Sequence, residues 1–168
     1  LGGYDPYSAS KACTEMMVNS WRSSFCGKGN FQKENIKIAT VRSGNVVGGG
    51  DWAKDRIIPD FVRAVLSNNP IKIRNPNSRR PWQHVLEPLS GYLTLGMNLD
   101  MKSNVNGQAF NFGPKSDVNK TVEDLIKDLS LKWGFERSKD SYEIIDNIPF
   151  HEAQLLKLNC DKAYFDLS

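Results

Sequence analysis

Tyr7-Ser8-Ala9-Ser10-Lys11 places a tyrosine four residues before a lysine, at the start of a run that predicts one helix over residues 7–26. Residues four apart lie on the same face of a helix, so the phenol and the ammonium would point into the same space. A tyrosine is a poor base near neutral pH because its phenol stays protonated, but a neighbouring cation favours the phenolate. The pair is therefore a candidate general base. The alternative is a surface tyrosine beside a solvated lysine.

The rest of the chain alternates between predicted strands and helices. A buried strand is expected over residues 36–42, followed by a glycine-rich loop over residues 44–56. Further strands are expected at residues 71–74, 109–112, 142–145 and 155–158, and helices at 59–67, 87–100 and 121–133. This alternation predicts an α/β fold.

Composition argues against several classes of partner and site. The net charge of +3 gives no case for nucleic acid or for a membrane surface. Three scattered cysteines do not form a disulfide framework, and neither histidine lies in a metal-ligand motif. No apolar run is long enough to span a bilayer and no signal peptide is visible, so we expect a cytoplasmic protein without a metal.

Several motifs together resemble a known family. Arg42-Ser43-Gly44-Asn45-Val46-Val47-Gly48 follows the strand expected at residues 36–42, and with the Tyr7–Lys11 helix it resembles the extended short-chain dehydrogenase/reductase family. More specific segments are similar to the CDP-glucose 4,6-dehydratases: residues 48–60, 74–76, 80–92, 110–114 and 151–153. The block Arg-Pro-Trp-Gln-His-Val-Leu-Glu-Pro at residues 80–88 is the specific part, whereas Tyr-x-x-x-Lys is shared by the whole superfamily.

The resemblance implies the C-terminal portion of a Rossmann-like fold with a small substrate-binding subdomain. Residues 1–52 would belong to the NAD-binding domain, and residues 53–168 mainly to the sugar-nucleotide-binding region, with some segments returning to the Rossmann-like domain. No Gly-x-Gly-x-x-Gly fingerprint occurs in the chain. We therefore interpret it as a fragment of a longer enzyme, without the family's dinucleotide loop and its Thr-Asp-Glu/Lys dehydration segment, and expect it to be inactive alone.

The implied reaction is dehydration of CDP-D-glucose to CDP-4-keto-6-deoxy-D-glucose with tightly bound NAD+, in deoxysugar synthesis for surface polysaccharide such as O-antigen. Tyr7 would be the base, Lys11 would support it and bind the nicotinamide ribose, and Arg42 would lie on the nicotinamide side. The substrate-binding residues implied by the resemblance are Asn45, Arg56, Arg74, Arg80, Asn111, His151 and Glu152.

Each of these roles has a structural alternative. A loop asparagine such as Asn45 is often a turn former, and Arg42 at a strand end equally fits a structural ion pair. The arginines of residues 74–80 could form a solvated loop rather than a phosphate site. The pair His151-Glu152 could be an ordinary surface loop.

Other functions remain open at this point. The protein could be another NAD-dependent sugar-nucleotide dehydratase or epimerase, or a non-catalytic module that binds a nucleotide sugar. It could also be a truncation that folds poorly because its strand edges are unpaired. The resemblance also implies a homodimer through the helix from Tyr7 to Trp21, which carries an apolar stripe of Met16, Met17 and Trp21.

Overall fold

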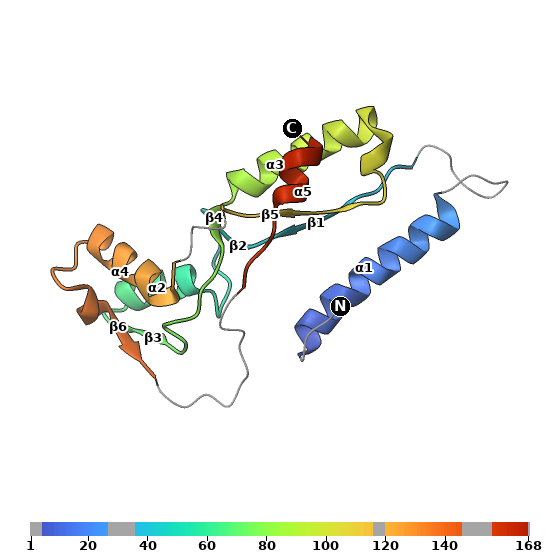
Figure 1. Cartoon of the computed structure of the whole chain (residues 1–168). Helices are drawn as coiled ribbons and strands as arrows, with labels where there is room; N and C mark the ends of the chain where they lie inside the picture. The colour runs from blue at the N-terminus through green and yellow to red at the C-terminus, as the bar shows by residue number, and fades with distance from the viewer. Residues whose placement is uncertain (1–4, 27–35, 116–119, 146–155, 168) are drawn as a thin grey trace. The chain divides into compact units, whose positions relative to one another are not determined.

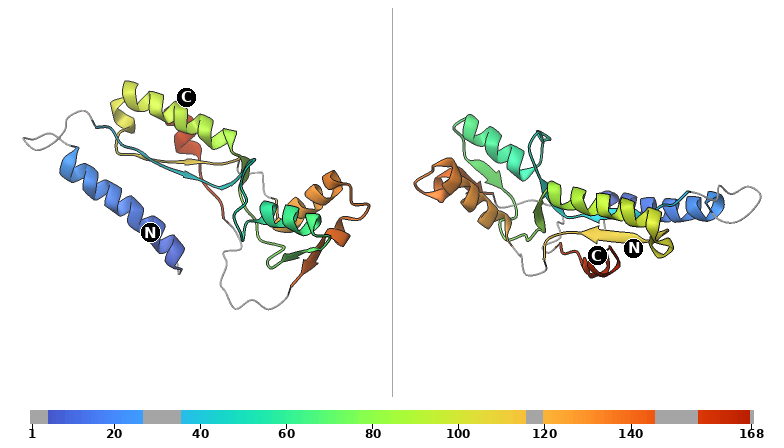
Figure 2. Two further views of the ribbon diagram at one scale, coloured as in Figure 1. Left: turned by 180° about the vertical axis from the view of Figure 1, so that it is seen from behind. Right: turned by 90° about the horizontal axis from the view of Figure 1, so that it is seen from above.

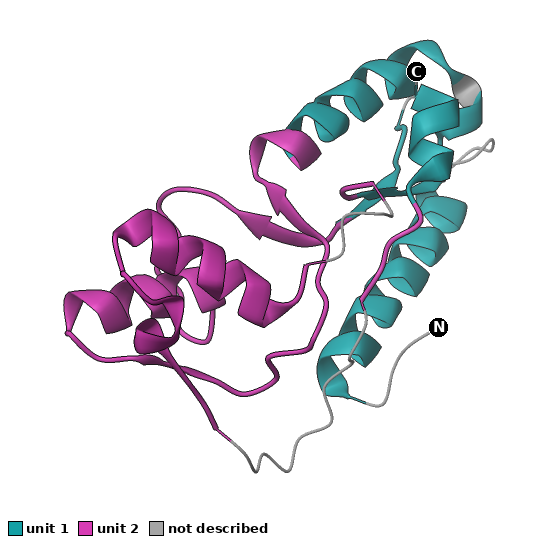
Figure 3. Ribbon diagram, turned by 60° about the vertical axis from the view of Figure 1, so that its left-hand side comes forward, with its two compact units in different colours: residues 1–42, 89–112, 160–168 teal, residues 43–88, 113–159 magenta. Residues whose placement is uncertain are grey.

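The computed structural model describes residues 5–26, 36–115, 120–145 and 156–167. Figure 1 shows the order of helices and strands along the chain. The chain folds into two compact units, which are shown in Figure 3. Unit 1 comprises residues 1–42, 89–112 and 160–168, and unit 2 comprises residues 43–88 and 113–159. Each unit is therefore assembled from segments that are far apart in the sequence.

Unit 1 packs helices against one pair of strands. Its elements are α1 (Pro6–Phe25), β1 (Thr40–Ser43), α3 (Leu86–Met101), the 3-10 turn η1 (Ser103–Val105), β5 (Ala109–Phe112) and α5 (Asp161–Leu167). Strands β1 and β5 are hydrogen-bonded neighbours, and α3 and α5 lie next to β5 (Figure 2). The core consists of Leu95, Val105, Phe110, Ala163 and Leu167.

A glycine allows α3 to lie close to β5. A Cβ atom added at Gly91 would lie 2.3 Å from the Phe112 ring, which is nearer than real Cβ atoms approach their neighbours. The next residue, Tyr92, packs edge-on against the same ring, with 5.3 Å between the ring centroids. The absence of a side chain at Gly91 therefore sets how closely this helix approaches the strand.

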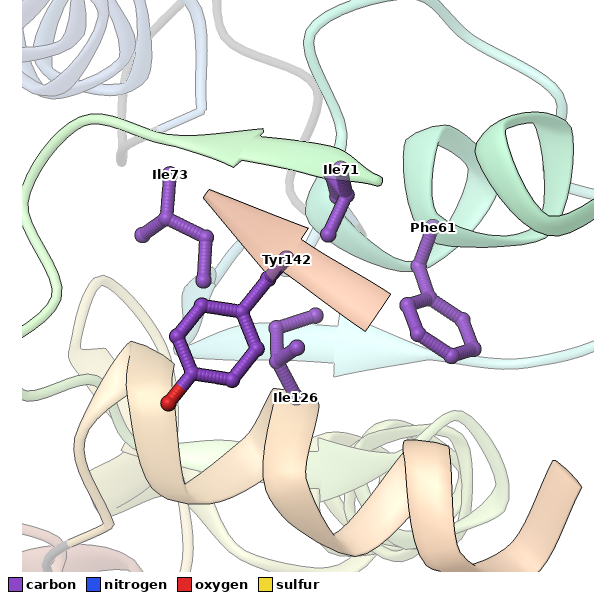
Figure 4. Close-up of a cluster of buried hydrophobic side chains, with 5 residues drawn as sticks. All are labelled: Phe61, Ile71, Ile73, Ile126 and Tyr142. Carbon is purple, nitrogen blue, oxygen red and sulfur yellow. The ribbon is translucent and has the colours of Figure 1, made fainter. Parts of the chain in front are cut away.

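Unit 2 is built around two parallel strand pairs. Its elements are β2 (Asn45–Val47), α2 (Ile57–Leu66), β3 (Ile71–Ile73), β4 (Trp82–His84), α4 (Val122–Trp133), the 3-10 turn η2 (Ser138–Ser141) and β6 (Tyr142–Ile144). Strand β2 pairs with β4, and β3 pairs with β6. Figure 4 shows the core, to which α2, β3, α4 and β6 contribute Phe61, Ile71, Ile73, Ile126 and Tyr142.

Helix α4 has the ends that its sequence predicts. The Thr121 side chain accepts a hydrogen bond from the Asp124 backbone N–H, and the Asp124 side chain accepts one from the Thr121 N–H, which together form a capping box. Gly134 ends the helix in the left-handed conformation, with φ of 100°. Both ends are decided by local hydrogen bonds, and the helix expected over residues 121–133 is confirmed.

Other predictions of secondary structure are wrong or incomplete. The strand expected over residues 36–42 is shorter, Thr40–Ser43, and it is not buried: all four of its residues are exposed or half-buried, with Val41 39% exposed. Residues 156–158 form no strand, although one was expected there. Strands β2 and β4 and helix α5 were not anticipated, because they are short and lack a periodic pattern.

The described helices include none with the length and apolar composition that a membrane span requires.

Tyr142 joins the unit 2 core to helix α4 through its hydroxyl group. The Tyr142 hydroxyl donates a 2.6 Å hydrogen bond to Oε1 of Glu123, which also forms a 3.0 Å ion pair with Lys127. Desolvation, followed by this hydrogen bond, raises the pKa of Tyr142 to about 12. The hydrogen bond from Tyr142, followed by that from Lys127, lowers the pKa of Glu123.

We expect Tyr142→Phe to lower the free energy of unfolding by about 1.5 kcal/mol at neutral pH, because a charge-assisted hydrogen bond is lost while the ring is kept. The Glu123 carboxylate must be ionised for the full effect. Because its pKa is lowered on folding, the stabilisation is present above the ordinary value of 4.5 and is lost as the pH falls through the lowered pKa. Urea unfolding measured at a series of pH values from about 7 down to about 2 tests this. Tyr7→Phe, at a tyrosine that is 72% exposed, is the control for stability. A wild-type to variant difference that does not shrink as the pH falls through this range would contradict the assignment.

Candidate active site

Helix α1 begins just before the tyrosine of the Tyr-x-x-x-Lys pair. Asp5 is its N-cap: the carboxylate accepts a 2.9 Å hydrogen bond from the Ser8 backbone N–H, and the Ser8 hydroxyl donates to it at 2.7 Å. These hydrogen bonds from Ser8 lower the pKa of Asp5. Pro6 follows in the first turn, where its missing N–H costs nothing. The local sequence thus starts the helix so that Tyr7 lies in its first turn.

Tyr7 and Lys11 share one face of α1, as their spacing predicts. The Lys11 Nζ atom lies 5.5 Å from the centroid of the Tyr7 ring. The Tyr7 side chain is 72% exposed in the described chain, so its hydroxyl is accessible to a ligand. The geometry thus places an ammonium over the ring of an exposed phenol, and these are the two groups that the predicted acid–base chemistry would use. The catalytic role itself stays a prediction.

Arg42 and Asn111 come from neighbouring strands of unit 1 and are in contact. Nη1 of Arg42, on β1, donates a 3.2 Å hydrogen bond to Oδ1 of Asn111, on β5. Nε of Arg42 forms a 2.8 Å ion pair with Oε1 of Glu15 on α1. The structure therefore brings together a predicted cofactor-binding residue and a predicted substrate-binding residue. It also gives Arg42 the ion pair that was its structural alternative.

Asn45 is the first residue of strand β2, not part of a loop. Its backbone N–H donates a 3.1 Å hydrogen bond to the Pro81 carbonyl, and it lies opposite Trp82 in the strand pair. The interpretation of Asn45 as a loop residue is wrong because parallel pairing with β4 draws this segment into a strand. The two strands approach so closely that a Cβ atom at Gly44 would lie 2.5 Å from Cγ of Pro81.

The predicted phosphate-binding arginines all belong to unit 2. Arg56 is exposed at the N-terminus of α2, where it is the N-cap residue. Nη2 of Arg74 lies 3.5 Å from Oδ1 of Asp55, so Arg74 lies beside the residue that precedes Arg56. Arg80 is partly buried, and its Nη1 donates a 3.0 Å hydrogen bond to the carbonyl of Arg79.

The remaining two predicted site residues, His151 and Glu152, lie outside the described residues. Within the described part of the chain, no group of three or more His, Cys, Asp or Glu side chains is placed to hold a metal ion. The predicted residues therefore fall into two sets, one in each unit: Tyr7, Lys11, Arg42 and Asn111 in unit 1, and Asn45, Arg56, Arg74 and Arg80 in unit 2.

A sequence model of the NAD-dependent epimerase/dehydratase family matches residues 4–113. The chain belongs to this family. One relative in the family is a CDP-glucose 4,6-dehydratase from Salmonella typhimurium, which is 46% identical over 99% of this chain. The aligned part makes up 46% of that protein, so the chain spans about half the length of this relative.

Solved structures of other proteins have the same fold at low sequence identity. One is a UDP-glucuronic acid 4-epimerase from Bacillus cereus in complex with UDP-glucuronic acid and NAD, with a TM-score of 0.75 and 20% identity over 97% of this chain. Another is a dTDP-glucose 4,6-dehydratase from Bacillus anthracis in complex with NAD, with a TM-score of 0.74 and 18% identity over 99% of this chain. The match covers 46% of each of those chains. The predicted fold class, a portion of a Rossmann-like α/β fold, is confirmed.

Two residues near the site were missed by the sequence reasoning. Glu15 lies four residues after Lys11, and this spacing was a usable signal that both share a helix face. Arg63, on α2, donates hydrogen bonds to the carbonyls of Trp52 and Ala53, at 2.9 and 3.0 Å, and forms an ion pair with Asp60. Nothing in the local pattern indicates that Arg63 holds the loop preceding α2.

We expect Arg63→Lys to loosen the loop over residues 51–56, because an ammonium cannot donate to both carbonyls in the planar geometry of a guanidinium. Loss of about 1 kcal/mol from local stability corresponds to roughly a fivefold rise in amide exchange there. Hydrogen exchange measured by mass spectrometry tests this. Arg137→Lys, at an exposed arginine without a side-chain capping bond, is the matched control. Unchanged exchange over residues 51–56 in the Arg63 variant would contradict the role of this guanidinium.

Proposed function

We propose that the protein carrying this chain dehydrates CDP-D-glucose to CDP-4-keto-6-deoxy-D-glucose and water, with NAD+ as a tightly bound cofactor. The observation that carries the proposal is the 46% identity, over 99% of the chain, to the Salmonella relative of that name. The block at residues 80–88, on which the resemblance to the CDP-glucose enzymes depends, supports the same substrate. A reducing cytoplasm, where the three cysteines would remain free thiols, is the proposed location.

The residues at the start of α1 fit the proposed cofactor and chemistry. A phenol hydroxyl and an ammonium lie on one face, and both can hydrogen-bond ribose hydroxyl groups. When bound, NAD+ supplies a hydride acceptor that later returns the hydride. Tyr7 would take the proton from the sugar hydroxyl at carbon 4. Lys11 would hold the ribose through its ammonium, on the same helix face as the phenol.

The proposed substrate-binding residues would hold the diphosphate and the nucleotide. Arg80 would bind phosphate oxygens through its guanidinium, with Arg56 and Arg74 as companions. Asn45 and Asn111 would contact the phosphate region through side-chain amides. His151 and Glu152 are proposed for the nucleotide end on the resemblance alone. In the same way, we assign residues 1–52 to the cofactor domain and residues 53–168 mainly to the substrate region.

Arg42 is proposed for the cofactor side, but its guanidinium also has partners within the protein. Its guanidinium contacts both Glu15 and Asn111, so a contribution to the nicotinamide side of the site would come in addition to a structural role. We propose that it serves the cofactor side chiefly by holding neighbouring side chains in place.

We expect Tyr7→Phe to lower kcat for CDP-glucose at least about a hundredfold, because the ring is kept while the acid–base group is lost. The measurement is formation of the 4-keto-6-deoxy product by the complete natural protein that carries these 168 residues, supplied with NAD+. Tyr164→Phe, on α5, is the matched control and should keep full activity.

Competition among CDP-, UDP-, dTDP- and GDP-glucose distinguishes the alternatives. Turnover of a different nucleotide sugar would keep the family chemistry and overturn the substrate. Binding of a nucleotide sugar with no turnover of any would favour the binding-module interpretation. A wild-type rate that Tyr7→Phe leaves unchanged would remove the tyrosine from the mechanism.

We further propose that the protein is a homodimer in which α1 packs against a second copy. Met17, Trp21 and Phe25 recur every four residues on α1 and are exposed, and the rings of Trp21 and Phe25 lie 5.6 Å apart. At about 100° per residue, Met17 and Trp21 lie roughly 160° and 120° around the helix from Glu15, which faces β1, whereas Phe25 lies only about 80° from it. Met17 and Trp21 are therefore directed away from the strand, where a symmetric interface could bury them.

Replacing both Met17 and Trp21 by Glu should convert the dimer to monomers at micromolar concentration, because burial of charge opposes association. Sedimentation velocity measures the change. Leu131→Glu, at a leucine of α4 that is 60% exposed, is the control and should leave the dimer intact. A wild-type monomer, or a dimer that survives the double substitution, would contradict this proposal.

A further inference from the structure

One carboxylate connects the middle of α1 to strand β1. Oε1 of Glu15 accepts a 2.8 Å hydrogen bond from Nε of Arg42, and Oε2 accepts a 2.8 Å hydrogen bond from the Thr40 hydroxyl. The Glu15 side chain is 19% exposed, so these bonds are partly shielded from water. Both oxygens of the carboxylate thus contact β1, at two residues that lie on either side of Val41.

Helix α1 has little else with which to fix its position on the strand. None of its 20 residues is buried in the described chain. Near its end, the Arg22 guanidinium lies over Gly107, where a Cβ atom would be 2.3 Å from the guanidinium carbon. No fully buried apolar side chain therefore determines how α1 sits on β1, and the hydrogen bonds of Glu15, with the packing of Arg22 on Gly107, remain to set its rotation and its position along the strand.

Glu15 lies on the same side of the helix as the proposed catalytic pair. At about 100° per residue, Lys11 is displaced by roughly 40° and Tyr7 by roughly 80° from Glu15 around the axis. A rotation or slide of α1 about this contact would consequently move the phenol and the ammonium relative to Arg42 and Asn111, whose side chains are joined to each other by a 3.2 Å hydrogen bond.

We propose that Glu15 is a positioning residue that locks α1 onto β1, so that Tyr7 and Lys11 are held at a fixed distance from Arg42 and Asn111. It contacts no reacting atom and transfers no proton. The inference rests on the proposed function, in which Tyr7 and Lys11 act on the sugar and Asn111 binds the substrate.

The chemistry of the contact explains why glutamate suits this position. Nε–H of Arg42 donates to one oxygen of the carboxylate and the Thr40 hydroxyl donates to the other, so both oxygens are used. Glutamine offers one acceptor oxygen for Arg42, and its amide nitrogen would need the Thr40 hydroxyl to turn and accept, while the charge that strengthens the bond to Arg42 would be lost. The hydrogen bond from Arg42, assisted by that from Thr40 and opposed by partial burial, lowers the pKa of Glu15. Glu15 is thus a carboxylate at the pH where the site would work.

The first test compares Glu15→Gln and Glu15→Ala with the wild type in the complete protein that carries this chain. Asn19→Ala, on an exposed residue one turn further along α1, is the matched control. We expect kcat per folded molecule to fall about 10- to 100-fold in Glu15→Ala, because a misplaced acid–base pair loses catalytic alignment. Glu15→Gln should be intermediate, and KM for the nucleotide sugar should change by less than about twofold in both variants. A merely structural role would reduce the folded fraction without this separation of kcat from KM.

A second measurement does not depend on turnover. Hydrogen exchange over residues 6–25 should become at least about tenfold faster in Glu15→Ala but not in Asn19→Ala, while exchange in β3 and β6 stays unchanged. Unchanged kcat per folded molecule, or unchanged exchange in α1, would overturn the inference. If the wild type turns over no nucleotide sugar, the proposed function fails, and the exchange result alone decides whether Glu15 holds the helix on the strand.

Discussion

Pairing between strands that are distant in the sequence is the constraint on which both units depend. Each of the three strand pairs in the described chain joins an early segment to a later one: β1 to β5, β2 to β4, and β3 to β6. Because each strand is only three or four residues long, no pair is stable by itself, and each requires a helix to cover it. In unit 2 the helices α2 and α4 pack on the β3–β6 pair, and in unit 1 α3 and α5 contribute to the core with β5.

The same pairing creates the polar contacts near the proposed catalytic residues. Arg42 and Asn111 can hydrogen-bond only because β1 and β5 are neighbours, and Glu15 reaches Arg42 only because α1 lies along β1. An arginine that serves two side chains at once restricts both, since its planar guanidinium has donors in fixed directions. The position of α1 relative to β1 and β5 therefore depends on the pairing of these two strands.

Membership of the NAD-dependent epimerase/dehydratase family places these contacts in a chemical context. The match to the family model runs from residue 4 to residue 113, which includes the start of α1 and ends just after β5. Since the chain spans about half the length of the Salmonella relative, the reaction is a property to be tested in the complete protein. The chain itself provides an ammonium over a phenol ring, a hydrogen bond between Arg42 and Asn111, and a set of exposed or half-buried arginines in unit 2.

The sequence by itself determined the features that depend on local hydrogen bonds and spacing. Asp5 and Pro6 set the start of α1, Thr121 and Gly134 set the ends of α4, and the four-residue spacing put Tyr7 and Lys11 on one face. Only the tertiary structure decided that Asn45 lies in a strand, that Arg42 joins Glu15 to Asn111, and that Arg63 holds the loop before α2. The physical reason is that a cap or a helix face is formed by residues a few positions apart, whereas these contacts join segments that approach each other only after strands and helices have packed.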